Sequence, residues 1–143
     1  MQDRLEKAAN IKLVIFDVDG VLTDGSLFIG DGGEEYKAFN SKDGHGLRML
    51  QNSGVDIAII TGRVSNVVEH RVKELGIKHV YKGKREKLPA YEELLKQVNL
   101  KPEQIAYVCY GVVDLPVVFR GGFAICVQDG HHHVKKHAHW ITV

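Results

Sequence analysis

Short apolar runs rich in Val and Ile alternate with segments of helical periodicity along this chain. The apolar runs predict strands at 11–16, 55–60, 78–81, 105–109 and 122–127. The segments between them predict helices near 44–53, 64–74, 86–98 and 114–119. Strands that alternate with helices favour an α/β fold, here a Rossmann-like parallel sheet with helices on both faces.

One segment interrupts this alternation. Two short β-like runs, 26–29 and 34–39, flank the turn sequence Gly30-Asp31-Gly32-Gly33, which is a hairpin signal. Ligand sites of open α/β sheets lie beyond the carboxyl ends of the strands. A small β-hairpin inserted after the first strand is therefore expected to overhang such a site, as a flap or as a contact between subunits.

Composition narrows the class of protein. The 143 residues suit one domain, so 1–143 is expected to form a single unit around a substantial core. A hydrophobic fraction of 44%, a charged fraction of 26% and a net charge of +1 are typical of a globular protein. Lys and Arg are scattered, without the basic face or interleaved aromatics of a nucleic-acid-binding surface.

The sequence also bears on cellular location and on the state of the cysteines. No apolar run approaches the roughly 18 residues of a membrane helix, and the first residues lack the apolar core of a secretion signal. We therefore expect a cytoplasmic protein without membrane or nucleic-acid partners. Cys109 and Cys126 each lie inside an apolar strand pattern, which predicts two reduced core thiols.

The first strand leads into a pair of acids, Asp17 and Asp19. Because side chains alternate along a strand, both carboxylates leave on the same side, about 6.5 to 7 Å apart at Cα. Two like charges this close raise each other's pKa unless a cation lies between them. The pair therefore predicts a site for a divalent metal ion.

Two further polar segments follow later strands. Thr61 and Arg63 end the second predicted strand, where Thr61 could donate to an anionic oxygen. A helix expected to start near Val64 would add the positive potential of its amides. The basic run 82–87 follows the third strand, and one lysine could reach a transferring phosphoryl group. Alone, each segment is also compatible with an ordinary turn or a solvated face.

Together these segments resemble the haloacid dehalogenase superfamily of phosphotransferases. The order Asp-x-Asp, a strand-end Thr, a Lys and a fourth acidic motif is that of the superfamily. Segments 17–25, 33–40, 42–46 and 60–63 further resemble its small phosphatases of acidic sugar phosphates, and the resemblance covers about 11–142. It implies a hydrolase of lipopolysaccharide biosynthesis that acts on 3-deoxy-D-manno-octulosonate 8-phosphate as a homotetramer.

The resemblance also implies a covalent mechanism. Asp17 would be the nucleophile that forms an aspartyl-phosphate, and Asp19 the general acid and then the base. Thr61 and Lys87 would bind the phosphoryl oxygens. Mg²⁺ would be held by Asp17, by Asp19 through its carbonyl, and by an acid of the fourth motif. The implied substrate-binding residues are Asp19, Asn40, Ser41, Lys42, Asp43, Gly44, Arg48, Arg63, Arg71 and Lys87.

The fourth motif departs from the superfamily pattern. Two acids are expected where this chain has Tyr110 and Gly111, and of the motif's acids only Asp114 remains as a candidate metal ligand. Tyr110 cannot serve as an anionic ligand, because a phenol with a pKa near 10 is neutral at pH 7. Impaired activity is therefore expected, and the alternative is a catalytically inactive relative that binds sugar phosphates or acts as an oligomeric partner.

A histidine-rich segment near the end of the chain offers a third hypothesis. His133 and His137, four residues apart within 129–139, could share a Zn²⁺ or Ni²⁺ ion. No carboxylate or cysteine pattern completes such a site. A polar helix face or an exposed turn is the simpler interpretation.

Overall fold

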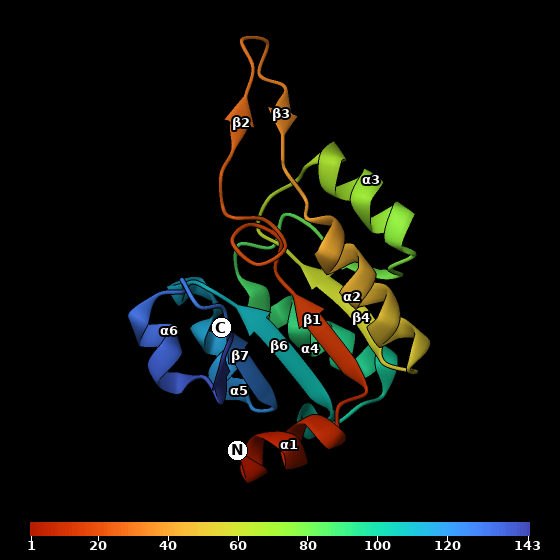
Figure 1. Cartoon of the computed structure of the whole chain (residues 1–143), viewed down its shortest axis with the longest axis vertical. Helices are drawn as coiled ribbons and strands as arrows, with labels where there is room; N and C mark the ends of the chain where they lie inside the picture. Colours follow the sequence, from red (N-terminus) through yellow and green to blue (C-terminus); the bar gives the residue numbers. More distant parts are fainter.

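The computed structural model describes residues 1–143 and contains a six-stranded parallel sheet (Figure 1). The strand order is β5-β4-β1-β6-β7-β8. The strands are β1 (Leu13–Phe16), β4 (Asp56–Ile60), β5 (His79–Tyr81), β6 (Ile105–Cys109), β7 (Phe123–Cys126) and β8 (Trp140–Ile141). The predicted fold class is confirmed. The sequence did not reveal β8, because two residues are too few to show a periodic pattern.

The register of the central strands brings their carboxyl ends level. Phe16, the last residue of β1, pairs with Ile59 of β4 and with Val108 of β6. The strand order reverses between β1 and β6, the place where open α/β sheets bind ligands. The residues that follow β1, β4 and β6 therefore meet at one edge of the sheet.

Helices cover both faces of the sheet. They are α1 (Gln2–Ala9), α2 (Ser41–Asn52), α3 (Asn66–Leu75), α4 (Lys87–Val98), α5 (Leu115–Arg120) and α6 (His132–His137). Short 3₁₀ turns span Pro102–Gln104 and Val112–Asp114. The helix predicted near 64–74 is present as α3, and its first helical residue, Asn66, lies two residues after the expected start near Val64. Helix α2 begins earlier than predicted, because the Asn40 side chain accepts a hydrogen bond from the Lys42 amide at 2.8 Å.

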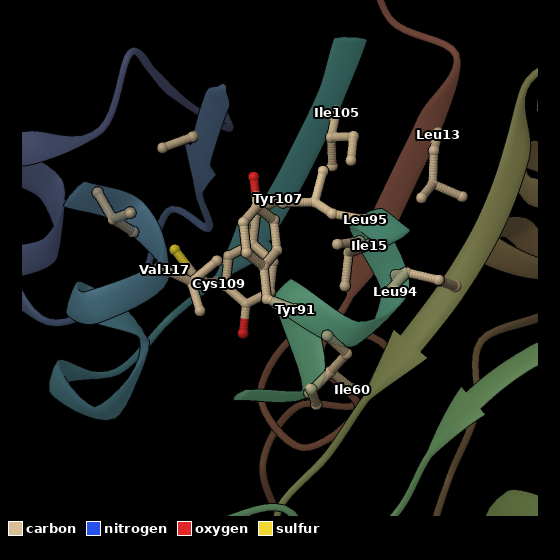
Figure 2. Packing of buried hydrophobic residues seen from close by; sticks show 14 of the residues in the cluster. Leu13, Ile15, Ile60, Tyr91, Leu94, Leu95, Ile105, Tyr107, Cys109 and Val117 are labelled. Atoms are coloured by element: carbon tan, nitrogen blue, oxygen red, sulfur yellow. The ribbon is translucent and has the colours of Figure 1, made fainter. Parts of the chain in front are cut away.

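The main core lies between the sheet and the helices α4, α5 and α6 (Figure 2). Leu13 and Ile15 of β1 point into it, and Tyr91 and Leu94 of α4 pack against them. A second cluster joins the opposite face of β4 to α2 and α3 through residues such as Ile59. Packing on both faces holds the central strands in place at the polar edge.

The predicted hairpin is present but shorter than the sequence patterns suggested. Its strands are β2 (Phe28–Ile29) and β3 (Glu35–Tyr36), paired antiparallel. The hairpin projects from the carboxyl edge of the sheet, beyond the end of β1 (Figure 1). Only two residues of each strand are paired, and no third strand lies alongside. Among the helices, none combines the length and the apolar character needed to cross a membrane.

Candidate active site

Neighbouring strands deliver polar side chains to one pocket. Asp17 follows β1, Thr61 follows β4 and Tyr110 follows β6, while Lys87 is the first residue of α4. The pocket has a volume of about 490 Å³. Its lining consists of Asp17, Asp19, Gly25, Leu27, Thr61, Gly62, Arg63, Arg85, Lys87, Tyr110 and Val113. The sheet thus brings all four residues with an implied catalytic role together.

A buried lysine bridges two carboxylates at the floor of this pocket. Lys87 Nζ lies 2.9 Å from Asp17 Oδ2 and 2.7 Å from Asp114 Oδ1. Asp17 also accepts a hydrogen bond from the Val18 amide at 2.7 Å. All three charged side chains are almost completely buried. The lysine therefore places a cation beside the Asp17 carboxylate from within the protein.

Burial and charge act against each other in this bridge. Burial raises the pKa of Asp17 above its usual value, although Lys87 acts in the opposite direction. For Lys87, burial alone would lower the pKa, but Asp17 and Asp114 outweigh it and raise the pKa. Lys87 is consequently a permanent cation at neutral pH, placed to attract an anionic oxygen.

Asp114 is fully occupied by internal partners. Besides Lys87, its carboxylate accepts hydrogen bonds from the Tyr107 hydroxyl at 2.8 Å and from the amides of Tyr110 and Gly111 at 3.3 and 3.1 Å. It has no exposed surface and does not line the pocket. Its contacts position Lys87 and the turn after β6.

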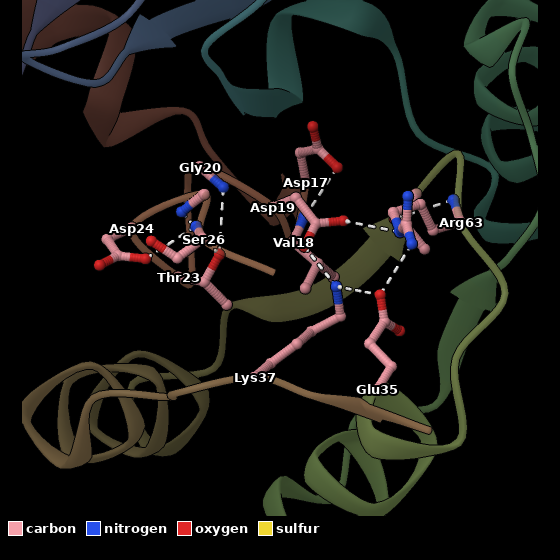
Figure 3. Close-up of polar contacts among 12 residues, drawn as sticks. Asp17, Val18, Asp19, Gly20, Thr23, Asp24, Ser26, Glu35, Lys37 and Arg63 are labelled. Carbon is pink, nitrogen blue, oxygen red and sulfur yellow. Dashed lines mark hydrogen bonds and ion pairs between the residues drawn. The ribbon is translucent and has the colours of Figure 1, made fainter. Parts of the chain in front are cut away.

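Two charged groups of the hairpin segment, Lys37 and Glu35, contact Asp19 and Arg63 of the site (Figure 3). Lys37 Nζ lies 2.5 Å from Asp19 Oδ1 and 3.6 Å from Glu35 Oε1. Arg63 lies 2.8 Å from Glu35 and 4.0 Å from Asp19 Oδ2. Both oxygens of Asp19 therefore face cations.

Tyr110 closes the side of the pocket where an acid was expected. Its ring lies against Gly20, where an added Cβ would sit 3.1 Å from ring atoms, and Gly20 has a φ of +85°. Gly20 is therefore required both for its conformation and for the close approach of the ring. Burial raises the pKa of the Tyr110 phenol, and the charge of Asp17 adds to this effect. The phenol stays neutral.

The residues present do not fit a magnesium ion. Nowhere in the structure do three or more His, Cys, Asp or Glu side chains converge as metal ligands. Of the three implied ligands, Asp19 would contribute only its backbone carbonyl, and the Asp114 carboxylate is enclosed by Lys87, Tyr107 and two backbone amides. Asp17 shares its charge with Lys87, whose ammonium would repel a dication. Magnesium requires near-octahedral oxygen ligands, and Tyr110 supplies no charge.

The implied substrate-binding residues divide into two groups. Asp19, Arg63 and Lys87 line the pocket. The remaining seven do not, namely Asn40, Ser41, Lys42, Asp43, Gly44, Arg48 and Arg71. Asn40 and Asp43 border a neighbouring hollow of about 550 Å³ on the other side of the loop 20–24.

Several of this second group join α2 to α3. Arg71 donates to the Asn40 carbonyl at 3.2 Å and lies so close to Gly44 that a Cβ there would be 2.5 Å from its guanidinium. Arg48 donates to the carbonyl of Glu74, near the end of α3, at 2.9 Å. These contacts stabilise the pair of helices, and a direct role in substrate binding stays a prediction.

The histidine-rich segment forms no metal centre. The rings of His131, His132 and His133 stack on one another, with centroids 4.2 to 5.4 Å apart. His133 and His137 are exposed residues of α6, without a third ligand. The polar helix face, the simpler of the two sequence interpretations, agrees with this arrangement.

Four side chains in or beside the site were not predicted from the sequence. Lys37 and Glu35 lie two residues apart in the hairpin, so the period-two alternation of a strand could have placed them together on the site face. Arg85 belongs to the basic run 82–87, but only its lysines were considered. The Tyr107 hydroxyl could not be assigned a partner without the fold.

Fold and site together define a phosphotransferase of the haloacid dehalogenase class. Asp17 and Asp19 follow the first strand of the parallel sheet, Thr61 follows the next strand along the chain, and Lys87 begins a helix. No family model matches the chain. The chain is 46% identical over 140 residues to the 3-deoxy-D-manno-octulosonate 8-phosphate phosphatase of Yersinia pestis. The aligned region covers 98% of this chain and 75% of the Yersinia protein. The chain belongs to the family of 3-deoxy-D-manno-octulosonate 8-phosphate phosphatases.

Solved structures agree with this assignment. A haloacid dehalogenase superfamily hydrolase of Legionella pneumophila has a TM-score of 0.97 at 42% identity, over 99% of this chain and 78% of that one. The phosphatase of Moraxella catarrhalis, solved with magnesium, phosphate and the sugar acid KDO, also has a TM-score of 0.97, at 40% identity. The match covers all of this chain and 82% of the Moraxella chain. The fold is shared throughout.

Proposed function

We propose that this protein is a phosphomonoester hydrolase that acts on an acidic sugar phosphate, 3-deoxy-D-manno-octulosonate 8-phosphate, through an aspartyl-phosphate. The observation that carries the proposal is the Lys87 bridge, which holds the carboxylate of Asp17 at the floor of a pocket beside Thr61. A buried carboxylate next to a cation is an activated nucleophile. The sugar acid in the Moraxella catarrhalis structure supports the choice of substrate class.

The steps follow from the residues in place. An oxygen of Asp17 attacks phosphorus while the bond to the sugar oxygen breaks, and Lys87 and Thr61 neutralise charge on the phosphoryl oxygens. The departing alkoxide takes a proton from Asp19, which enters this step in its protonated form. Asp19, now a carboxylate, then accepts a proton from a water that attacks the aspartyl-phosphate, and is protonated once more. Inorganic phosphate leaves and both carboxyl groups return to their starting states.

A second function, binding without turnover, is favoured by the fourth motif. Tyr110 replaces an acid, and Lys37 lies 2.5 Å from the carboxylate of Asp19. For Asp19 to act as an acid it must hold a proton, and that ion pair must open. A protein in which it never opens would bind the sugar phosphate and retain it.

Phosphate release from 3-deoxy-D-manno-octulosonate 8-phosphate tests the proposal. We expect slow turnover by the parent protein, and at least about a thousandfold loss in Asp17→Asn, because an amide cannot attack phosphorus as a carboxylate does. The double variant Tyr110→Asp with Gly111→Asp, assayed with magnesium and with chelator, should turn over faster, and only with magnesium. Absence of turnover in the parent, with clear turnover in the double variant, would leave the binding function in its place.

The oligomeric state and the cellular location that we propose also come from the resemblance. A homotetramer is supported by exposed apolar side chains on the hairpin, Phe28, Ile29 and Tyr36, which a partner subunit would cover. A cytoplasmic location is supported by the two unpaired buried thiols. Light scattering should give four times the mass of the 16.0 kDa chain, and a single-chain mass would contradict the tetramer.

A further inference from the structure

We infer that the pocket captures the phosphoryl group with its own cations, Lys87, Arg63 and Arg85, so that phosphate binding does not depend on a divalent metal. The inference rests on the proposed function, because it concerns the same pocket and the same phosphoryl group. It departs from the magnesium that the resemblance implied.

The first reason is the charge that lines the pocket. Three cationic side chains, Lys87, Arg63 and Arg85, face two carboxylates, Asp17 and Asp19. A phosphate dianion entering this pocket meets three cationic side chains without any added ion, and one of them, Arg85, forms no ion pair with an acid. Arginine also offers paired N–H donors that match two phosphate oxygens.

The second reason is that the carboxylates are already neutralised from within. Lys87 lies within 3 Å of both Asp17 and Asp114, at 2.9 and 2.7 Å. Lys37 lies 2.5 Å from Asp19 and comes from the hairpin, outside the pocket lining. A magnesium ion would have to displace these ammonium groups or bind carboxylates that are already paired with them. The acid that would otherwise help to bind the ion is replaced by Tyr110.

The third reason is the position of Arg85. It lies two residues before Lys87, in the loop that leads into α4, and it lines the pocket. No acid is paired with Arg85 in the structure, whereas Arg63 is held by Glu35 and Lys87 by its two carboxylates. Arg85 is therefore the cation most available to an incoming phosphate.

Calorimetric titration of the full chain with inorganic phosphate tests whether phosphate binds without a divalent metal. The titration is done first in chelator and then with millimolar magnesium. We expect the parent dissociation constant to agree within about twofold between the two conditions. Arg85→Gln should weaken phosphate binding about tenfold, because a hydrogen bond to a charged group is lost. The matched control is Lys84→Gln, which removes the same charge from an exposed neighbour outside the pocket and should change binding less than about twofold.

Each other outcome is decisive. Phosphate binding by the parent only in magnesium, or equal effects of Arg85→Gln and Lys84→Gln, would overturn the inference, as would no binding in either condition. In the double variant Tyr110→Asp with Gly111→Asp, magnesium should tighten phosphate binding, which shows that the assay detects a metal site when one exists. Binding and turnover are measured separately, so a parent that binds phosphate but hydrolyses no substrate contradicts only the proposed function.

Discussion

Asp114 shows at the scale of one residue how a motif acid can keep its place in the sequence and serve a structural purpose. Its carboxylate accepts four hydrogen bonds, from Lys87, from the Tyr107 hydroxyl and from the amides of Tyr110 and Gly111. It satisfies donors that would otherwise be buried without a partner. Through Lys87 it also fixes the position of the proposed nucleophile.

Removal of this carboxylate should therefore be costly. We expect Asp114→Ala to lower the free energy of unfolding by about 3 to 5 kcal/mol, because it leaves a buried ammonium and several donors without their partner. Urea denaturation at pH 7 measures this. Glu92→Ala is the matched control, since Glu92 forms an exposed ion pair with Arg120 and its loss should cost less than about 1 kcal/mol. Equal costs for the two variants would show that Asp114 is not a centre of stability.

At the scale of the element, the hairpin depends on charges rather than on pairing. Strands β2 and β3 share only two residue pairs, and an isolated two-stranded hairpin is marginal in water. The contacts of Lys37 with Asp19, and of Glu35 with Arg63, attach the base of the hairpin to the carboxyl edge of the main sheet. Asp19 is thus coupled to the position of the hairpin.

Loss of the Lys37 charge should loosen this attachment. In Lys37→Met we expect amide hydrogen exchange in 27–37 to rise about tenfold while the strands of the main sheet stay protected, because the hairpin opens locally. Mass spectrometry of peptic peptides resolves the two regions. Lys42→Met, which removes an exposed lysine at the start of α2, is the control and should leave hairpin exchange as in the parent. Unchanged exchange in Lys37→Met would assign hairpin order to other contacts.

At the scale of the whole molecule, the main core contains several ionisable groups in their neutral forms. The Cys109 thiol and the Tyr107 phenol lie in the same cluster as Leu13 and Ile15, beneath the active-site edge. Burial raises the pKa of Cys109, and the nearby charge of Asp114 adds to it. Burial and Asp114 likewise raise the pKa of Tyr107 well above its ordinary value. The fold therefore holds protons that the unfolded chain would release.

Stability should consequently fall in alkali. Above pH 9.0, the ordinary pKa of a thiol, unfolded Cys109 loses its proton while the folded form keeps it. The folded state then binds more protons, so the free energy of unfolding decreases by up to about 1.4 kcal/mol per pH unit for this group. Urea denaturation between pH 8 and 10.5 should give a shallower slope for Cys109→Ala than for the parent. Equal slopes would show that Cys109 does not cause the loss of stability in alkali, whatever the free energy of unfolding of the two proteins at pH 7.

Much of the fold could be predicted because its strands are buried on both faces and read as continuous apolar runs. The runs at 11–16 and 105–109 correspond to β1 and β6, and the hairpin turn was marked by its glycines. Helix starts were less certain, as at α3, because local caps decide them. Strand β8 and helix α1 carry too few patterned residues to stand out.

The sequence by itself determined the order of strands and helices, the pair Asp17 and Asp19 at the end of the first strand, and the absence of acids at Tyr110 and Gly111. These are local properties of composition and spacing. The tertiary structure alone decided that Lys87 bridges Asp17 to Asp114, that Lys37 of the hairpin meets Asp19, and that Arg85 enters the pocket. Such contacts join residues far apart in the chain, and they arise because parallel strands bring their carboxyl ends to one edge.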